Sequence, residues 1–259
     1  MRLFFQVKSI AHKYLAKDTV AALRRGGAWL TLCLPLMRIS DLEVLASLHQ
    51  AEKEKGFLRP YTTFFAPLRK RSINLLEIGI GGAGNPHKGG GSLRMWRCFF
   101  PHGKIFGIDL YDKTPQNEPG RIRTFRGDQS DATFLRQVAT EIGRLDIVID
   151  DGSHRNPDVI QSFETLFPLL ADGGIYVIED LQTSYWQAYG GSSENADATG
   201  TTMSMLKRLT DGLNYQEYEV DDYRPNYYDE HVVGIYSGHN IAFIFKGDNT
   251  TGSNILGKR

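Results

Sequence analysis

The chain has 259 residues, of which 41% are hydrophobic and 23% charged, and its formal net charge is zero. This composition is typical of a globular protein rather than a disordered or membrane-embedded one, and the charge balance argues against a nucleic-acid partner, which usually meets a basic surplus. Cys33 and Cys98 are the only cysteines, which argues against a disulfide framework and fits the cytoplasmic location that we expect.

The first 70 residues are predicted to form a helical extension. Apolar residues recur at helical spacing from Leu3 to Leu15 among basic ones, which indicates an amphipathic helix that packs on the body of the protein or on a partner subunit. We therefore expect a homo-oligomer. The apolar stretch from Ala28 to Met37 is shorter than the roughly 20 residues of a spanning helix, so we expect no integral membrane segment.

The second half of this extension holds another predicted helix. Asp41 is a candidate cap, and apolar residues from Leu42 to Leu48 share one face of the helix that follows. A less regular segment is expected from Gly56 to Pro67.

Between residues 71 and 248 the pattern becomes one of short apolar strands that alternate with helices. Strands are expected over 73–78, 104–109, 122–127, 145–150 and 174–179, and helices over 92–100, 132–142 and 156–170. This alternation predicts right-handed βαβ units, and hence an α/β domain with a mainly parallel central sheet covered on both faces.

The last part of the chain is predicted to add an antiparallel hairpin to this sheet. Small and polar residues over 190–200 indicate a long loop, and a helix is expected over 202–213. Two alternating segments, 232–237 and 241–246, flank a Gly-His turn and predict the hairpin. Residues 249–259 are expected to be a flexible tail.

Acidic residues lie in or just after each of the five predicted strands between residues 73 and 179. Ligands of open α/β sheets bind outside the carboxyl ends of the strands, so these residues and their polar neighbours are candidate site residues. They are Glu77, Asp109, Asp128 with Gln129, Asp150 and Asp151 with His154, and Glu179 with Asp180.

A glycine-rich turn follows the first strand, where Gly79-x-Gly81-x-x-Gly84 matches the dinucleotide fingerprint. Glu77 is unusual beside a diphosphate, because it adds negative charge there. An acid before a glycine turn suits a cationic ligand without phosphate, such as S-adenosylmethionine. In this interpretation the turn approaches the methionine part, Asp109 accepts hydrogen bonds from the ribose, and Asp128 or its neighbours face the adenine.

Several motifs together resemble one known family, the metal-dependent sugar O-methyltransferases of macrolide biosynthesis (mycinamicin type). The similarity runs from about residue 60 to 247, and its motifs are residues 75–82, 89–96, 127–131, 149–154 and 178–186. The resemblance implies a Rossmann-like class I methyltransferase fold, S-adenosylmethionine and Mg²⁺ as cofactors, and a sugar hydroxyl as the methyl acceptor.

The resemblance also implies roles for individual residues. Asp151, Glu179 and Asp180 are expected to bind the metal, and His154 to act as the general base beside Asp151. The cofactor is expected to contact Glu77, Gly79, Gly81, Ser92, Asp109, Asp128, Gln129 and Asp150. For Asp150, orienting a partner or capping the next helix remain equal alternatives.

These assignments make chemical sense of the paired acids. A divalent cation between carboxylates removes their mutual repulsion, and ligands that are all oxygen suit Mg²⁺. A metal stabilises the oxyanion that develops on an acceptor hydroxyl. An imidazole ordinarily titrates near neutral pH, which suits a group that takes the hydroxyl proton.

The nature of the acceptor is open at this point. A small-molecule or oligosaccharide glycoside is expected, and Tyr185 and Trp186 are either core residues or aromatic contacts for the sugar. A catechol-type metal-dependent O-methyltransferase is the alternative enzyme. A nicotinamide oxidoreductase is disfavoured by Glu77, and a non-catalytic cofactor-binding subunit has no need to hold these acids beside His154.

Overall fold

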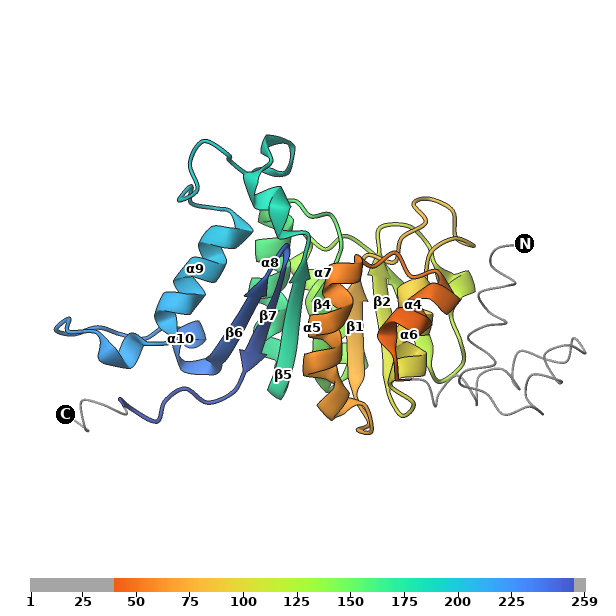
Figure 1. Ribbon diagram of the computed structural model, residues 1–259, viewed down its shortest axis with the longest axis horizontal. Helices are drawn as coiled ribbons and strands as arrows, with labels where there is room; N and C mark the ends of the chain where they lie inside the picture. The colour runs from red at the N-terminus through yellow and green to blue at the C-terminus, as the bar shows by residue number, and fades with distance from the viewer. Residues whose placement is uncertain (1–39, 254–259) are drawn as a thin grey trace, which may run out of the picture.

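A seven-stranded sheet forms the centre of the protein in the computed structural model, which describes residues 40–253 (Figure 1). The strand order is β3-β2-β1-β4-β5-β7-β6. Strands β1 to β5 run parallel to one another, whereas β7 is antiparallel to both β5 and β6. The strands are β1 (Asn74–Ile78), β2 (Lys104–Asp109), β3 (Ile122–Arg126), β4 (Leu145–Asp150), β5 (Leu170–Glu179), β6 (Val232–Gly238) and β7 (Ile241–Lys246). The predicted mainly parallel sheet with a C-terminal hairpin is therefore confirmed.

Helices cover both faces of the sheet. The α-helices are α4 (Leu42–His49), α5 (Lys55–Phe65), α6 (Gly91–Phe99), α7 (Ala132–Ile142), α8 (Asn156–Leu166), α9 (Thr202–Gly212) and α10 (Tyr227–His231). Short 3-10 helices are η1 (Ala66–Leu68), η2 (Thr114–Gln116), η3 (Phe167–Leu169), η4 (Leu181–Tyr185), η5 (Gln187–Tyr189) and η6 (Tyr215–Glu217). In Figure 1, α4, α5 and α6 lie in front of the sheet and α7 and α8 behind it.

The two faces of the sheet are two separate cores. Strand β4 is buried along its whole length, and residues 147–149 alternate between the two cores. Ile147 and Ile149 pack with the α4, α5 and α6 side, whereas Val148 packs with the α7, α8 and α9 side. A parallel strand that is covered on both faces needs this continuous apolar sequence.

Helix α5 differs from the prediction, which had an irregular segment over 56–67. Pro60 lies inside this helix, where it removes a backbone hydrogen bond and disfavours helix on propensity alone. The helix forms because it buries the large side chains of Tyr61 and Phe65 completely. Tyr61 packs against both Trp96 and Phe243, so tertiary contacts outweigh the local preference.

The remaining boundaries differ from the predictions by a few residues. The helix expected to reach residue 170 ends at Leu166, and β5 begins at Leu170 rather than 174. A register irregularity lies at the start of the β4–β5 pairing, which explains why the pattern did not show the earlier start. Asp41 caps α4 as predicted, since its carboxylate accepts hydrogen bonds from the backbone of Glu43 and Val44.

The predicted helix of the first 24 residues lies outside the described residues, as does 254–259 of the predicted tail. At the start of that tail, the Asn249 side chain donates to the carbonyls of Leu213 and Asp229. Over residues 40–253, no helix is long and apolar enough to cross a membrane.

Candidate active site

The site begins where β1 and β4 end side by side. The backbone N–H of Asp151 donates to the carbonyl of Ile78 at 3.0 Å, and Gly79 lies directly against this loop. A Cβ on Gly79 would lie 2.0 Å from the Asp151 carbonyl oxygen, and the φ of Gly79 is +87°. Only glycine fits this close approach. Gly79, the first glycine of the fingerprint, therefore lets the loop after β1 contact the loop after β4.

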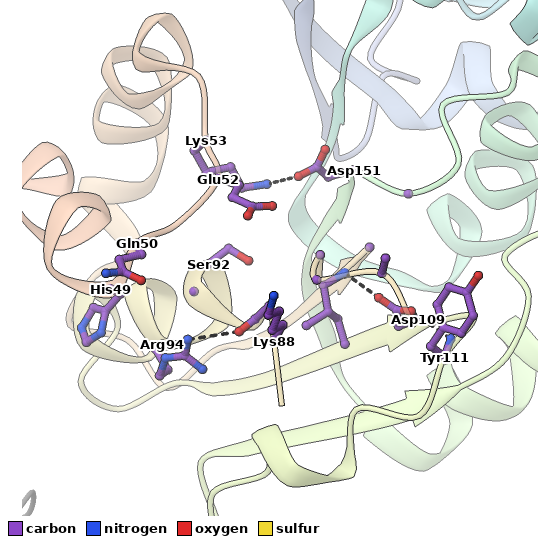
Figure 2. A pocket seen from close by; sticks show the side chains of 18 of the residues that line it. His49, Gln50, Glu52, Lys53, Lys88, Ser92, Arg94, Asp109, Tyr111 and Asp151 are labelled. Atoms are coloured by element: carbon purple, nitrogen blue, oxygen red, sulfur yellow. Dashed lines mark hydrogen bonds and ion pairs between the residues drawn. The ribbon is translucent and has the colours of Figure 1, made fainter. Parts of the chain in front are cut away.

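Two cavities open at this edge of the sheet. The main cavity, of about 760 Å³, is lined by predicted cofactor residues (Gly79, Gly81, Ser92 and Asp109) and by Asp151, His154 and Asp180 (Figure 2). A side cavity of about 350 Å³ shares Gly79, Asp109 and Gly152 with it and continues along Asp128 and Gln129. Six of the eight predicted cofactor residues therefore line one connected region.

Asp109 fixes the shape of this region as well as lining it. Its Oδ2 accepts a hydrogen bond from the backbone N–H of Ile80 at 3.1 Å, and its Oδ1 accepts from that of Tyr111 at 2.9 Å. The carboxylate thus holds the glycine turn after β1 to the loop after β2. Each oxygen has a second lone pair that remains available for a ligand hydroxyl.

The other two predicted cofactor residues, Glu77 and Asp150, lie behind the cavities. Glu77 is fully buried, and its Oε2 accepts a hydrogen bond of 2.6 Å from the Ser92 hydroxyl, which does line the main cavity. Asp150 accepts from the Gln129 amide at 3.1 Å, and Gln129 in turn accepts from the backbone N–H of Ser153. Both acids are placed to orient residues that line the cavities.

Lys53 is a site residue that the sequence analysis missed. It lies between α4 and α5, and its ammonium is within 2.6 Å of both Asp151 Oδ2 and Glu179 Oε1 and 2.9 Å from Glu77 Oε1. Figure 2 shows it reaching toward Asp151 across the top of the main cavity. Burial alone lowers the pKa of a lysine, but these three carboxylates together raise the pKa of Lys53 well above its ordinary value.

Asp151, His154 and Asp180 are the group of described residues that can hold a metal ion. Their ligand atoms lie within 4.8 Å of one another, and all three side chains are partly exposed to the main cavity. Glu179, the third predicted ligand, has a different environment, since both Lys53 and the Tyr61 hydroxyl bind its Oε1. Two carboxylates and an open cavity fit the few protein ligands that Mg²⁺ takes.

His154 and Asp180 share an unusual backbone conformation. Both have a φ of +57°, in the left-handed region that residues other than glycine rarely adopt. In this conformation the two side chains face each other, with His154 Nε2 3.4 Å from Asp180 Oδ2. Strain of this kind collects at functional sites, where the surrounding structure holds it in place.

Tyr185 and Trp186, the predicted acceptor contacts, lie apart from these cavities. Their exposed fractions are 39% and 49%, so neither is a core residue. Trp186 packs on Tyr189, with ring centroids 5.9 Å apart. Neither ring lines the cavities found next to the acids in residues 40–253.

Comparison with known proteins gives one consistent answer. The chain is 46% identical over 220 residues, 83% of its length, to mycinamicin VI 2''-O-methyltransferase of Micromonospora griseorubida. It is 48% identical to demethylmacrocin O-methyltransferase of Streptomyces fradiae over 76% of its length. A solved structure of MycE methyltransferase with Mg, SAH and mycinamycin VI superimposes with a TM-score of 0.80 at 42% identity and covers 92% of the chain.

The chain belongs to the family of sugar O-methyltransferases of macrolide and polyketide glycoside biosynthesis. The predicted resemblance is thereby confirmed, and so is the class I methyltransferase fold. No family model matches the chain. It spans about half the length of the curated relatives that it matches, 55% of the first and 50% of the second, and 64% of the MycE chain.

The burial of Asp150 makes the stability of the protein depend on pH. Burial raises the pKa of Asp150 to about 7, against the hydrogen bonds from Gln129 and Gly152. Between pH 4 and 7 the folded protein therefore binds a proton that the unfolded chain has released, so stability falls as pH rises. We expect Asp150→Asn to remove this fall, which amounts to roughly 4 kcal/mol at most.

The measurement is urea unfolding of wild type and Asp150→Asn at pH 5 and pH 8. The stability of the variant relative to wild type should improve from pH 5 to pH 8, whatever the constant cost of the new amide group. Asp172→Asn, at an exposed acid at the start of β5, is the control and should leave the pH dependence unchanged. A parallel pH dependence in wild type and Asp150→Asn would contradict the assignment.

Proposed function

We propose that the protein is an S-adenosylmethionine- and Mg²⁺-dependent O-methyltransferase that acts on a sugar hydroxyl of a glycoside. The observation that carries this is the meeting of His154 with Asp151 and Asp180 in a cavity that the glycine turn also lines. The matched relatives are named as O-methyltransferases of sugar-bearing natural products, and MycE has been solved with Mg and SAH. The expected cytoplasmic location remains part of this proposal.

The cofactor fits the two connected cavities. The side cavity, with Asp128 and Gln129, is placed for the adenine, and Asp109 lies between the two cavities where a ribose would bridge them. The methionine part then lies in the main cavity along Gly79 and Gly81. This order follows from the lining residues and from the acid at the end of β2, which accepts hydroxyl hydrogen bonds.

The metal fits the acids that line the main cavity next to the glycine turn. Asp151 and Asp180 are partly exposed carboxylates that would hold Mg²⁺, and Glu179 has its Oε2 to offer, because its contacts with Lys53 and Tyr61 are to Oε1. When bound, Mg²⁺ supplies positive charge that stabilises an oxyanion developing on the acceptor.

His154 is placed to take the proton of the acceptor hydroxyl. Its Nε2 faces the same carboxylate, Asp180, that would hold the metal, so the base and the oxyanion-stabilising charge converge on one oxygen. The left-handed turn at His154 aims the ring in this direction. The protein's contribution is then alignment of the proton acceptor and the methyl acceptor.

Calorimetric titration tests this proposal directly. We expect wild type to bind S-adenosylhomocysteine and then Mg²⁺, and Asp151→Ala to keep the first and lose the second, because the variant removes one of two exposed carboxylates. Absence of nucleoside binding by wild type would refute the methyltransferase proposal. Nucleoside binding without Mg²⁺ binding would refute the role given to the acids.

A further inference from the structure

The loop between β1 and α6 is one wall of the main cavity. We call it the 81–90 loop. The residues with which it lines that cavity are Gly81, Gly82, Ala83, His87, Lys88 and Gly89. None of these described residues lines the side cavity. In the proposed arrangement of the cofactor, the 81–90 loop therefore borders the methionine part and leaves the adenine to other segments.

A buried lysine holds the 81–90 loop in place. Lys113 follows β2 and is 1% exposed. Its ammonium donates hydrogen bonds to the carbonyls of Ala83 at 2.7 Å, Asn85 at 3.1 Å and Lys88 at 3.3 Å. An ammonium has three protons to donate, so this one loop can use all of them.

The Lys113 ammonium has no carboxylate within ion-pair distance among residues 40–253. Lysines are seldom fully buried without an acid, because a buried charge is costly unless other groups compensate it. Here the compensation comes from the three loop carbonyls. Because these hydrogen bonds are directional, the ammonium holds the backbone of the loop in one conformation, which an apolar side chain at this position would not do.

The backbone that Lys113 binds is strained and tightly folded. Ala83 accepts the shortest of the three bonds and has a φ of +44°, in the left-handed region that residues other than glycine rarely adopt. Near the other end of the loop, a Cβ on Gly89 would lie 2.3 Å from the Gly81 carbonyl oxygen, so the two arms of the loop are in contact. A conformation of this kind persists only where surrounding groups hold it.

A second side chain from the same segment holds the other part of the loop. Gln116 Nε2 donates to the Pro86 carbonyl at 3.0 Å, and Gln116 Oε1 accepts from the Arg94 guanidinium at 2.7 Å. Arg94 also donates to the Gly89 carbonyl at 3.1 Å. Lys113 and Gln116 are the two ends of one short turn, η2, which therefore holds the loop at both places.

We propose that Lys113 is a positioning residue for the methyl donor, with Gln116 in a supporting role. Lys113 lines neither cavity itself, and it acts by keeping the 81–90 loop in the shape that binds the methionine part. The inference rests on the proposed function and adds a residue on which the selectivity for the cofactor depends. Lys113 then matters for the amino-acid part of the ligand and not for its adenosine part.

The experiment is calorimetric titration with S-adenosylhomocysteine and with methylthioadenosine, which has the same adenosine but no amino-acid part. Wild type should bind both. We expect Lys113→Met to bind S-adenosylhomocysteine at least about tenfold more weakly, while its affinity for methylthioadenosine changes by less than about twofold. Lys104→Met, at an exposed lysine at the start of β2, is the matched control and should bind both as wild type does.

Trypsin cleavage after Lys88 tests the loop without any ligand. Lys88 is exposed, and a loop that is no longer held opens more often to a protease. Lys113→Met should therefore be cut there faster than wild type, and Lys104→Met should not. An unchanged rate in Lys113→Met would overturn its role in holding the loop.

The outcomes separate this inference from the function on which it rests. If wild type binds neither nucleoside, the methyltransferase proposal fails and the inference fails with it. If wild type binds both and Lys113→Met loses them equally, or loses neither, the proposed function stands and the inference is wrong. Gln116→Met, at a partly exposed side chain, should also weaken S-adenosylhomocysteine selectively. It carries the test if Lys113→Met does not fold, and a change that is the same for both nucleosides would again overturn the inference.

Discussion

Replacing His154 by alanine is expected to lower the rate of methyl transfer by about 10²–10⁴-fold while S-adenosylhomocysteine still binds. An aliphatic hydroxyl holds its proton tightly, and His154 Nε2 is the nitrogen that faces the Asp180 carboxylate at the acceptor end of the main cavity. The assay is transfer of a labelled methyl group to mycinamicin VI and to 8-demethyl-8-α-L-rhamnosyl tetracenomycin C, acceptors taken from the names of two relatives.

His102 provides the matched control for this prediction. It is an exposed histidine just before β2, at the amino edge of the sheet and away from the site, so His102→Ala should retain the wild-type rate. The same experiment separates the two enzyme classes weighed from the sequence. A catechol hydroxyl is acidic enough to need little help from a base, so near-normal transfer by His154→Ala to a phenolic acceptor would favour the catechol-type alternative.

The sheet and the place of the site were predictable because each depends on local pattern. Every strand core from β1 to β7 reads as a short apolar or alternating segment, and the carboxyl edge of a parallel sheet follows from the order of elements. Once the edge is known, the acids from Asp109 to Asp180 have to gather there. This prediction needed only the positions of the acids in the sequence and no knowledge of how their side chains pack.

What the sequence did not show depends on contacts between distant residues. Helix α5 contains Pro60, and the aromatic packing that stabilises it comes from α6 and β7. Lys53 carries no signal at all, since a lysine in a predicted loop is ordinarily solvated. Its partners Asp151 and Glu179 are 98 and 126 residues away, so only the folded chain identifies it.

The acid cluster shows the same limit at the level of single atoms. The motif predicted Asp151, Glu179 and Asp180 as equivalent ligands, yet their surroundings differ. Glu179 is buried, and burial raises its pKa, with the Lys53 ammonium opposing this effect. Asp180 is held open to the main cavity by a left-handed backbone. Which oxygen faces a ligand is set by these neighbours and not by the spacing.

Lys53→Met is accordingly expected to destabilise the protein by about 3–5 kcal/mol, because it leaves buried carboxylates without their counter-charge. The Lys53 side chain is 1% exposed, Glu77 is fully buried, and the ammonium bridges Glu77 and Glu179. Burial raises the pKa of Glu179 to about 8 already in the wild type, so the loss should be smaller at pH 7 than at pH 9. Without Lys53 the pKa of Glu179 rises further, so the folded variant takes up a proton that the unfolded chain lacks, and its stability falls more steeply as pH rises.

Urea unfolding at both pH values measures this effect, with Lys55→Met as the control. Lys55 is an exposed lysine two residues along the chain, so its substitution should change stability by less than about 0.5 kcal/mol at either pH. A loss below about 1 kcal/mol for Lys53→Met, or a loss that is the same at pH 7 and pH 9, would mean that the three carboxylates are compensated without the ammonium. A large, pH-dependent loss would make Lys53 the residue that holds the acid cluster together before any metal arrives.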